Sequence, residues 1–243
     1  MMLTLNSFKI KIHFQWSVLL LICLAYEYGS SVFLSEYPNQ PLMSNLMGIF
    51  LAIAILLSII IHELAHVTVG RLYGMTFDGI EIFFLGGAAR MTTLPRTSKA
   101  EFLMAIAGPI SSGIIAFSCF FISIGFGFLI YDHNNIIGDF ILLCSGINTL
   151  LALFNLIPFY PLDGGRVMHS IIWYVKKDYI ESAVISLKIS LVCCLLLCVY
   201  GFSLIINSSV FSGLWIIMLS FFIYISGRME VSNMKQSQAH RSI

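Results

Sequence analysis

The chain has 243 residues, of which 58% are hydrophobic and only 10% are charged, and its formal net charge at pH 7 is +1. Soluble globular domains carry about a quarter charged residues, so this chain has too few charges to cover a water-facing surface. A nearly neutral chain also lacks the basic surface with which proteins bind nucleic acids. The composition therefore predicts a membrane protein that is surrounded by lipid and has no nucleic-acid partner.

Six segments are long and apolar enough to cross a bilayer, because a spanning helix needs ~20 mostly apolar residues. In chain order they are residues 12–33, 46–69, 102–131, 136–157, 183–206 and 210–226. We therefore predict an all-α polytopic membrane protein with about six transmembrane helices. We expect one membrane-embedded domain, residues 1–243, with its core at residues 46–166. A short polar tail follows at residues 228–243.

The basic residues are distributed unevenly along these segments. All 13 lysine and arginine residues lie before the first segment, between the second and third, between the fourth and fifth or just inside the fifth, and after the sixth. Cytoplasmic loops of membrane proteins carry an excess of lysine and arginine. The pattern predicts a multi-pass protein of the cell membrane with both termini in the cytoplasm.

The second segment ends in His62-Glu63-Leu64-Ala65-His66. Residues four apart on a helix lie on one face, so both imidazoles can reach one metal ion. Glu63 lies beside the first of them and can accept a proton from a metal-bound water. Ionisable residues inside a membrane span are energetically unfavourable and mark functional sites, although a polar cluster satisfied by neighbouring helices is an alternative. We predict His62 and His66 as metal ligands and Glu63 as the general base.

A catalytic zinc usually takes three protein ligands, so one more is needed. Asp163 follows the fourth segment, where prolines end the helix and Gly164 and Gly165 permit a tight backbone path. The second and fourth segments run in the same direction, so Asp163 should reach the depth of the two histidines. We predict Asp163 as the third ligand of one Zn²⁺ per chain, although iron or cobalt could occupy the same ligands. Six other acidic residues sit among basic ones and are expected in solvated loops: Asp78, Glu81, Glu101, Asp178, Glu181 and Glu230.

Three motifs together resemble the site-2 protease family of intramembrane metalloproteases. They are the His62–His66 motif, Ala107-Gly108-Pro109, and the stretch from Asn155 to Gly164, which reads NLIPFYPLDG. The resemblance covers residues 46–166. It implies a six-span fold with zinc bound by the two histidines and the aspartate, and it implies that Asn155 helps to hold or polarise the reacting group. The family commonly has glycine in place of Ala65 and often an asparagine where this chain has Ser111-Ser112-Gly113.

These residues predict a zinc metalloendopeptidase that cuts a peptide bond within, or at the cytoplasmic edge of, a transmembrane helix of a membrane-protein substrate. Such a reaction belongs to regulated intramembrane proteolysis, and the sequence identifies no regulatory partner. A metal transporter is one alternative, but transporters usually show repeated halves, which this sequence lacks. A non-catalytic metal-binding scaffold is another. A third is a zinc peptidase whose last ligand is a helix glutamate such as Glu181.

Residues 79–90, GIEIFFLGGAAR, are rich in residues that favour β-structure and contain a pair of glycines. We expect a short membrane-associated β-hairpin here, with an amphipathic loop as the alternative. A free strand edge could bind an extended substrate segment by adding it as a further strand. His169, six residues after Asp163, is expected to be an interfacial histidine, with a place behind the metal ligands as the alternative.

Overall fold

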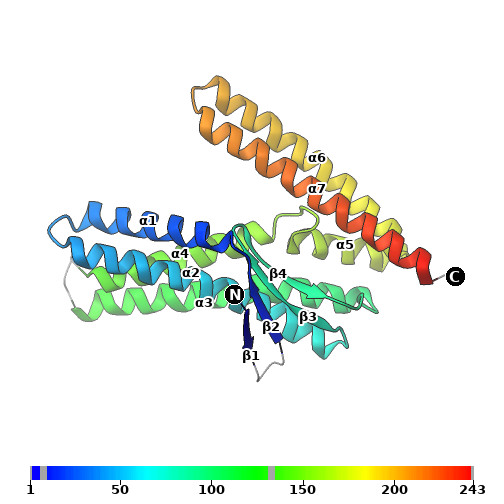
Figure 1. Ribbon diagram of the computed structural model, residues 1–243, viewed down its shortest axis with the longest axis horizontal. Coiled ribbons are helices and arrows are strands. Elements are labelled where there is room, and N and C mark those ends of the chain that lie inside the picture. Colours follow the sequence, from blue (N-terminus) through cyan, green and yellow to red (C-terminus); the bar gives the residue numbers. More distant parts are fainter. Residues whose placement is uncertain (1, 6–9, 131–134, 242–243) are drawn as a thin grey trace. The chain divides into compact units, whose positions relative to one another are not determined.

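The computed structural model describes the backbone of residues 2–5, 10–130 and 135–241. Within these residues it contains four strands and seven helices (Figure 1). The elements in chain order are β1 (Met2–Leu5), β2 (Ile10–Phe14), α1 (Val18–Glu36), α2 (Pro41–Leu72), β3 (Phe77–Phe83), β4 (Gly86–Met91), α3 (Ser98–Ile130), α4 (Ile136–Asn155), α5 (Asp163–Lys176), α6 (Tyr179–Ile206) and α7 (Val210–Arg241).

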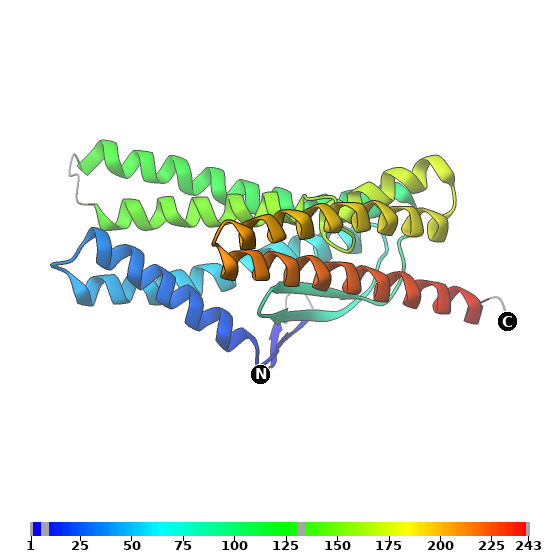
Figure 2. The ribbon, with the colours of Figure 1, turned by 90° about the horizontal axis from the view of Figure 1, so that it is seen from above.

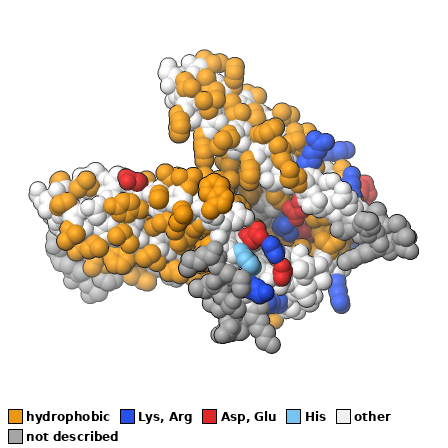
Figure 3. Space-filling model, viewed as in Figure 1, with side chains coloured by type: hydrophobic (Ala, Val, Ile, Leu, Met, Phe, Trp, Pro, Cys, Tyr) orange, Lys and Arg blue, Asp and Glu red, His pale blue; other side chains and the backbone are white. Residues whose placement is uncertain are grey.

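Six helices are long and apolar enough to cross a membrane, namely α1, α2, α3, α4, α6 and α7. The predicted six-span, mainly helical fold is therefore confirmed, and the chain is a multi-pass membrane protein. Many large apolar side chains on these helices are exposed, among them Leu19, Phe117 and Val199, as expected where lipid replaces water. Figure 3 shows hydrophobic side chains along the visible faces of α6 and α7.

The described chain divides into two compact units. The first consists of Met1–Pro95 and Ala107–Phe154, and the second of Arg96–Ile106 and Asn155–Ile243. Helix α3 starts in the second unit and continues into the first. Its first turns therefore belong with α5, α6 and α7, while its later turns belong with α1, α2, α4 and the strands.

The first unit contains a four-stranded sheet in the order β1-β2-β3-β4. Strand β2 pairs antiparallel with β1 and parallel with β3. Side chains alternate between the two faces of a strand, and Ile10, Ile12, Ile80 and Ile82 are buried together in a cluster with α2 residues such as Val67. The alternating sequence IKIHF at residues 10–14 therefore forms a strand, not the start of the first span at residue 12 as predicted, and α1 begins at Val18.

The expected hairpin is confirmed. Strands β3 and β4 pair antiparallel, with Phe83 opposite Gly86, so that two residues form the turn. Gly86 has a φ of +137°, a backbone conformation that favours glycine. Among the described strands only β3 pairs with β4, so the other edge of β4 carries no strand. Both strands of the hairpin contact α2.

The second unit is built on α6 and α7, which lie side by side in both ribbon views (Figures 1 and 2). Small residues allow this close approach, since a Cβ atom on Gly213 would lie 2.4 Å from the carbonyl oxygen of Gly201. Two stretches outside the predicted spans are helical. Residues 163–176 form α5, and the polar tail continues α7 through residues 228–241.

Candidate metal centre

The two histidines and the glutamate of the α2 motif lie in the first unit. His62, Glu63 and His66 have exposed fractions of only 3%, 7% and 7%. The ring centroids of His62 and His66 are 4.9 Å apart, and the two ring planes meet at an angle of 75°. The four-residue spacing on one helix therefore brings the two imidazoles together as predicted, at a place that is shielded from the surroundings.

Gly108 on α3 provides a test of whether these histidines can hold a metal. A Cβ atom at Gly108 would lie 2.2 Å from His66 Nε2 and 2.6 Å from His62 Nε2. The two Nε2 atoms thus face the same point beside the α3 backbone, and the missing side chain leaves room for them. Imidazole nitrogen is a common zinc ligand, so this arrangement fits a metal ion.

Ser112, one turn further along α3, binds the other nitrogen of His62. Its Oγ lies 2.9 Å from His62 Nδ1, and its side chain is fully buried. Metal-ligating histidines usually donate their second ring N–H to such a partner, which fixes the tautomer and the ring orientation. With Nδ1–H donating to Ser112, the Nε2 lone pair of His62 is available for a metal.

Glu63 lies against the edge strand β4. A Cβ atom at Gly87 would lie 2.6 Å from Glu63 Cγ and 3.0 Å from its Oε1. The absence of a side chain at Gly87 therefore allows the strand backbone to approach the carboxylate. The predicted general base and the predicted substrate-binding hairpin are neighbours in the first unit.

Asp163 is the first residue of α5, in the second unit. The glycines after it permit a close approach, because a Cβ at Gly164 would lie 2.1 Å from the carbonyl oxygen of Leu156. The partial positive charge at a helix N-terminus favours an ionised carboxylate here. His62, His66 and Asp163 form a group of side chains that could hold a metal ion.

Asn155 is the last residue of α4 and is half-buried. It also belongs to the second unit. Its expected part in holding or polarising the reacting group stays a prediction.

Two acidic residues expected in solvated loops are not there. Glu101, in the first turn of α3, is fully buried and lies 2.9 Å from His169. Glu230 is partly buried and pairs with Arg166 at 2.6 Å. His169, expected at an interface, is fully buried as well.

Sequence reasoning also missed Ser112, which was considered only as a position where relatives often have asparagine. A signal was available, because Glu101, Gly108 and Ser112 are spaced by seven and four residues. Such residues share one face of a helix. In an apolar helix, a polar residue or a glycine at each of these positions indicates that this face packs against polar side chains of the protein and not against lipid.

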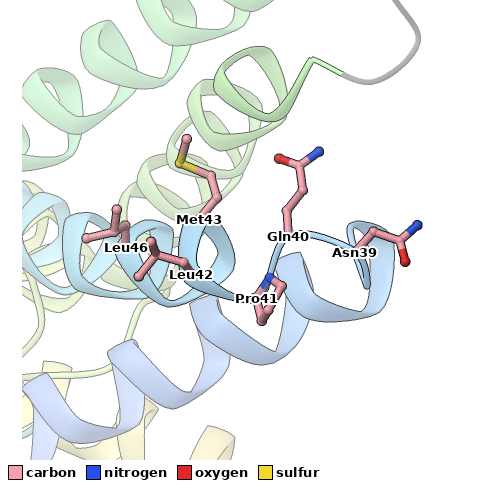
Figure 4. Close-up of a pocket in the computed structure, with 6 residues that line it drawn as sticks. All are labelled: Asn39, Gln40, Pro41, Leu42, Met43 and Leu46. Atoms are coloured by element: carbon pink, nitrogen blue, oxygen red, sulfur yellow. The ribbon is translucent and has the colours of Figure 1, made fainter.

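A shallow pocket lies at the other end of α2, lined by Asn39, Gln40, Pro41, Leu42, Met43 and Leu46 (Figure 4). Pro41 precedes His62 by 21 residues, which is about 32 Å along a helix. No ionisable side chain lines the pocket. It is therefore separate from the candidate metal centre.

The fold and the histidine motif define a class, that of polytopic membrane proteins with a candidate metal site inside a spanning helix. The sequence model of peptidase family M50 matches residues 50–133 and 130–198. The chain belongs to this family, the site-2 protease family.

Individual relatives agree. Rip3 of Mycobacterium tuberculosis is 28% identical over 233 residues, which cover 96% of this chain and 58% of Rip3. Zinc metalloprotease MJ0392 of Methanocaldococcus jannaschii is 30% identical over 204 residues, covering 82% of this chain and 55% of that protein. The chain thus spans little more than half the length of these curated relatives. The solved structure of a site-2 protease from Methanocaldococcus jannaschii matches with a TM-score of 0.64 at 26% identity, covering 95% of this chain and 94% of that one.

Proposed function

We propose that this chain is an intramembrane zinc metalloendopeptidase of the His-Glu-x-x-His type. His62, His66 and Asp163 bind one Zn²⁺, and Glu63 is the general base. The observation that carries the proposal is the convergence of both Nε2 atoms on the backbone of Gly108. The zinc metalloprotease name of a 30% identical relative supports the same reaction.

The chemistry follows from the residues around this point. Held by these three residues, zinc would supply a water whose pKa is lowered toward ~7 and a site that polarises the scissile carbonyl group. Glu63 accepts a proton from the attacking water and delivers it to the leaving amine. Because Glu63 is only 7% exposed, bulk water does not compete for its carboxylate. Asn155 donates a hydrogen bond toward the developing oxyanion.

The substrate is a transmembrane helix of another membrane protein. Its peptide bonds are engaged in intrahelical hydrogen bonds, so a segment must become extended before it can be hydrolysed. The open edge of β4 supplies a place for that segment, which binds as an added strand. Gly87 brings this edge next to Glu63, so a segment paired with β4 lies beside the general base.

The cut is at or near the cytoplasmic end of the substrate helix, in the cell membrane. All 13 basic residues fall on the side that holds both termini, which the positive-inside rule assigns to the cytoplasm. The histidines lie in the last third of α2, which runs toward that side. The reaction is therefore that of regulated intramembrane proteolysis, with membrane lipid and a transmembrane protein substrate as the partners.

The test uses detergent-purified protein and a model single-span substrate. Glu63→Gln keeps the ligands but removes the proton acceptor, so we expect bound metal to be retained and cleavage to be abolished. Metal is measured on the preparation used for the cleavage assay, and wild-type cuts are mapped by mass spectrometry. Cleavage by Glu63→Gln would exclude the general-base role. A metal transporter or a metal-binding scaffold would give no cleavage with the wild-type protein, and cuts at the outer end of the substrate would contradict the proposed orientation.

A further inference from the structure

A buried ion pair between Glu101 and His169 lies in the second unit and has no part in the proposed chemistry. Both side chains are fully buried, and His169 Nδ1 lies 2.9 Å from Glu101 Oε1. The other ring nitrogen, Nε2, lies 3.0 Å from the backbone carbonyl oxygen of Tyr179. A carbonyl only accepts hydrogen bonds, so Nε2 carries a hydrogen and donates it. The imidazole is therefore fixed at both nitrogens.

Aromatic rings enclose the same imidazole. The ring centroids of Tyr179, Tyr160 and Trp173 lie 4.8, 5.8 and 6.3 Å from that of His169. These rings come from the start of α6, the loop before α5, and α5 itself. Burial lowers the pKa of His169, but the hydrogen bond and charge of Glu101 and the bond to the Tyr179 carbonyl outweigh it, so the pKa lies above its ordinary value. His169 thus joins three segments in one arrangement.

Stability alone does not account for such a pair. Replacing a buried ion pair by apolar residues is often neutral or stabilising, because desolvation opposes the electrostatic attraction. Oε2 of Glu101 has no hydrogen-bond partner among the described residues, so the carboxylate depends on His169 for its compensation. The best-attested benefit of a buried pair is that it specifies one geometry.

The geometry that this pair specifies is the placement of α5. His169 lies six residues after Asp163, about 9 Å along the helix axis. The first turn of α5 rests on the backbone of the preceding loop, since a Cβ at Gly165 would lie 2.4 Å from the backbone nitrogen of Tyr160. The next turn is tied through His169 to α3. Together these two contacts hold the helix that starts at Asp163.

Glu101 lies in the first turn of α3. The pair with His169 therefore anchors α5 to the start of α3, within the second unit.

We propose that Glu101 and His169 are positioning residues, whose pair ties α5 to α3 and so places the Asp163 carboxylate as a metal ligand. This inference rests on the proposed function, since it takes Asp163 as the third ligand.

The test measures Zn²⁺ affinity of the full chain in detergent by competition with a chromophoric chelator. We expect Glu101→Ala and His169→Ala to weaken it at least about tenfold, as loss of a supporting contact behind a ligand does. Glu101→Gln can still donate to Nδ1 of a neutral His169, so it should stay within about twofold of wild type. Glu181→Ala, which removes only an exposed ion pair with Lys176, is the control. Wild-type affinity in both single alanine variants would overturn the positioning role.

An apolar double variant separates positioning from stability. Glu101→Met with His169→Phe should recover the melting temperature, because apolar replacement of a buried pair is tolerated, yet its Zn²⁺ affinity should remain low. If a single alanine variant does not fold, the Zn²⁺ affinity of this double variant tests the proposal instead. Recovery of affinity together with the melting temperature would overturn the proposal.

A double-mutant cycle with Asp163 tests whether the Glu101–His169 pair affects Zn²⁺ affinity through Asp163. If the pair acts through Asp163, His169→Ala should have no further effect on Zn²⁺ affinity in an Asp163→Ala background. An equal loss of Zn²⁺ affinity from His169→Ala in the wild-type and Asp163→Ala backgrounds would show that the pair does not act through Asp163, and would overturn the proposal. Undiminished affinity in Asp163→Ala alone would overturn the third-ligand assignment as well. Loss in Asp163→Ala with none in His169→Ala would overturn only the positioning role.

Discussion

The two histidines of α2 and Asp163 of α5 are held in different ways, although we propose that they bind one ion. His62 and His66 are four residues apart in the last third of a regular 32-residue helix, so the helix itself sets their spacing. Asp163 begins a helix of 14 residues. Its position depends on the loop before it, on glycine contacts with that loop, and on the buried pair behind it.

This difference separates local from remote support. Around the histidines, the residues that matter touch the imidazoles directly, as Gly108 and Ser112 do. Around Asp163, support comes from residues several positions away, such as His169. Substitutions near the histidines should therefore act by contact, and substitutions in the second unit should act by moving a helix.

The largest expected effect is that of removing the ligand on the short helix. Asp163→Ala should abolish cleavage and tight metal binding, because two histidines alone leave a catalytic zinc short of the usual three ligands. The loss of metal affinity should exceed the about 10–100-fold that is typical for loss of an outer-shell partner. Metal content after dialysis and a cleavage assay on the same preparation check it.

Glu181→Ala is the matched control for a helix glutamate as the last ligand. Glu181 lies in the first turn of α6 and is exposed, so its removal should leave both metal content and cleavage unchanged. Stoichiometric metal in Asp163→Ala, or loss of metal in Glu181→Ala, would falsify the assignment of Asp163.

A smaller effect is expected in the first unit, where contact is direct. Gly87→Val places a side chain where Glu63 Cγ would lie 2.6 Å from its Cβ, so the flexible Glu63 side chain must move. A misplacement of about 1 Å at a reacting group can lower the rate about 100-fold. We expect cleavage to fall by that order while bound metal is unchanged.

Gly113→Val is the control for this change, since nothing lies within 4 Å of a Cβ added at Gly113. Cleavage by the control should match that of the wild type. If Gly87→Val also released metal, the strand would be supporting the ligands and not the general base.

The parts of the site that follow from one regular element could be predicted from sequence. The His62 and His66 pair follows from helical periodicity, and the hairpin follows from β-forming residues and glycines at residues 79–90. The six spans follow from apolar length alone. In each case the signal lies within a short stretch of the chain.

The parts that depend on distant partners were missed. Strand β2 pairs with β3, about 70 residues later, and a five-residue alternating stretch beside an apolar span is easily assigned to the span. Helix α5 is not among the predicted helices, because the sequence analysis finds only a tight backbone path at Gly164 and Gly165, and those glycines pack closely on the preceding loop. Glu101 lies near basic residues in the sequence, which favours a solvated position. In the structure it is buried and pairs with His169, 68 positions away.

The smallest expected effect is that of the hydrogen bond behind His62. Ser112→Ala removes the Oγ atom 2.9 Å from Nδ1 and leaves the ligands in place. A hydrogen bond of this kind contributes about 0.5–1.5 kcal/mol net, which corresponds to a loss of about 2- to 12-fold in zinc affinity. The expected loss is therefore no more than about tenfold, the low end of the range for outer-shell partners. Ser111→Ala is matched to it, because Ser111 Oγ donates to the Gly108 carbonyl and not to a histidine. Chelator competition on the two variants decides the matter. Equal zinc affinities in the two variants would mean that His62 is oriented by its helix alone. Direct contact with a neighbouring side chain would then not distinguish the histidines of α2 from Asp163 of α5.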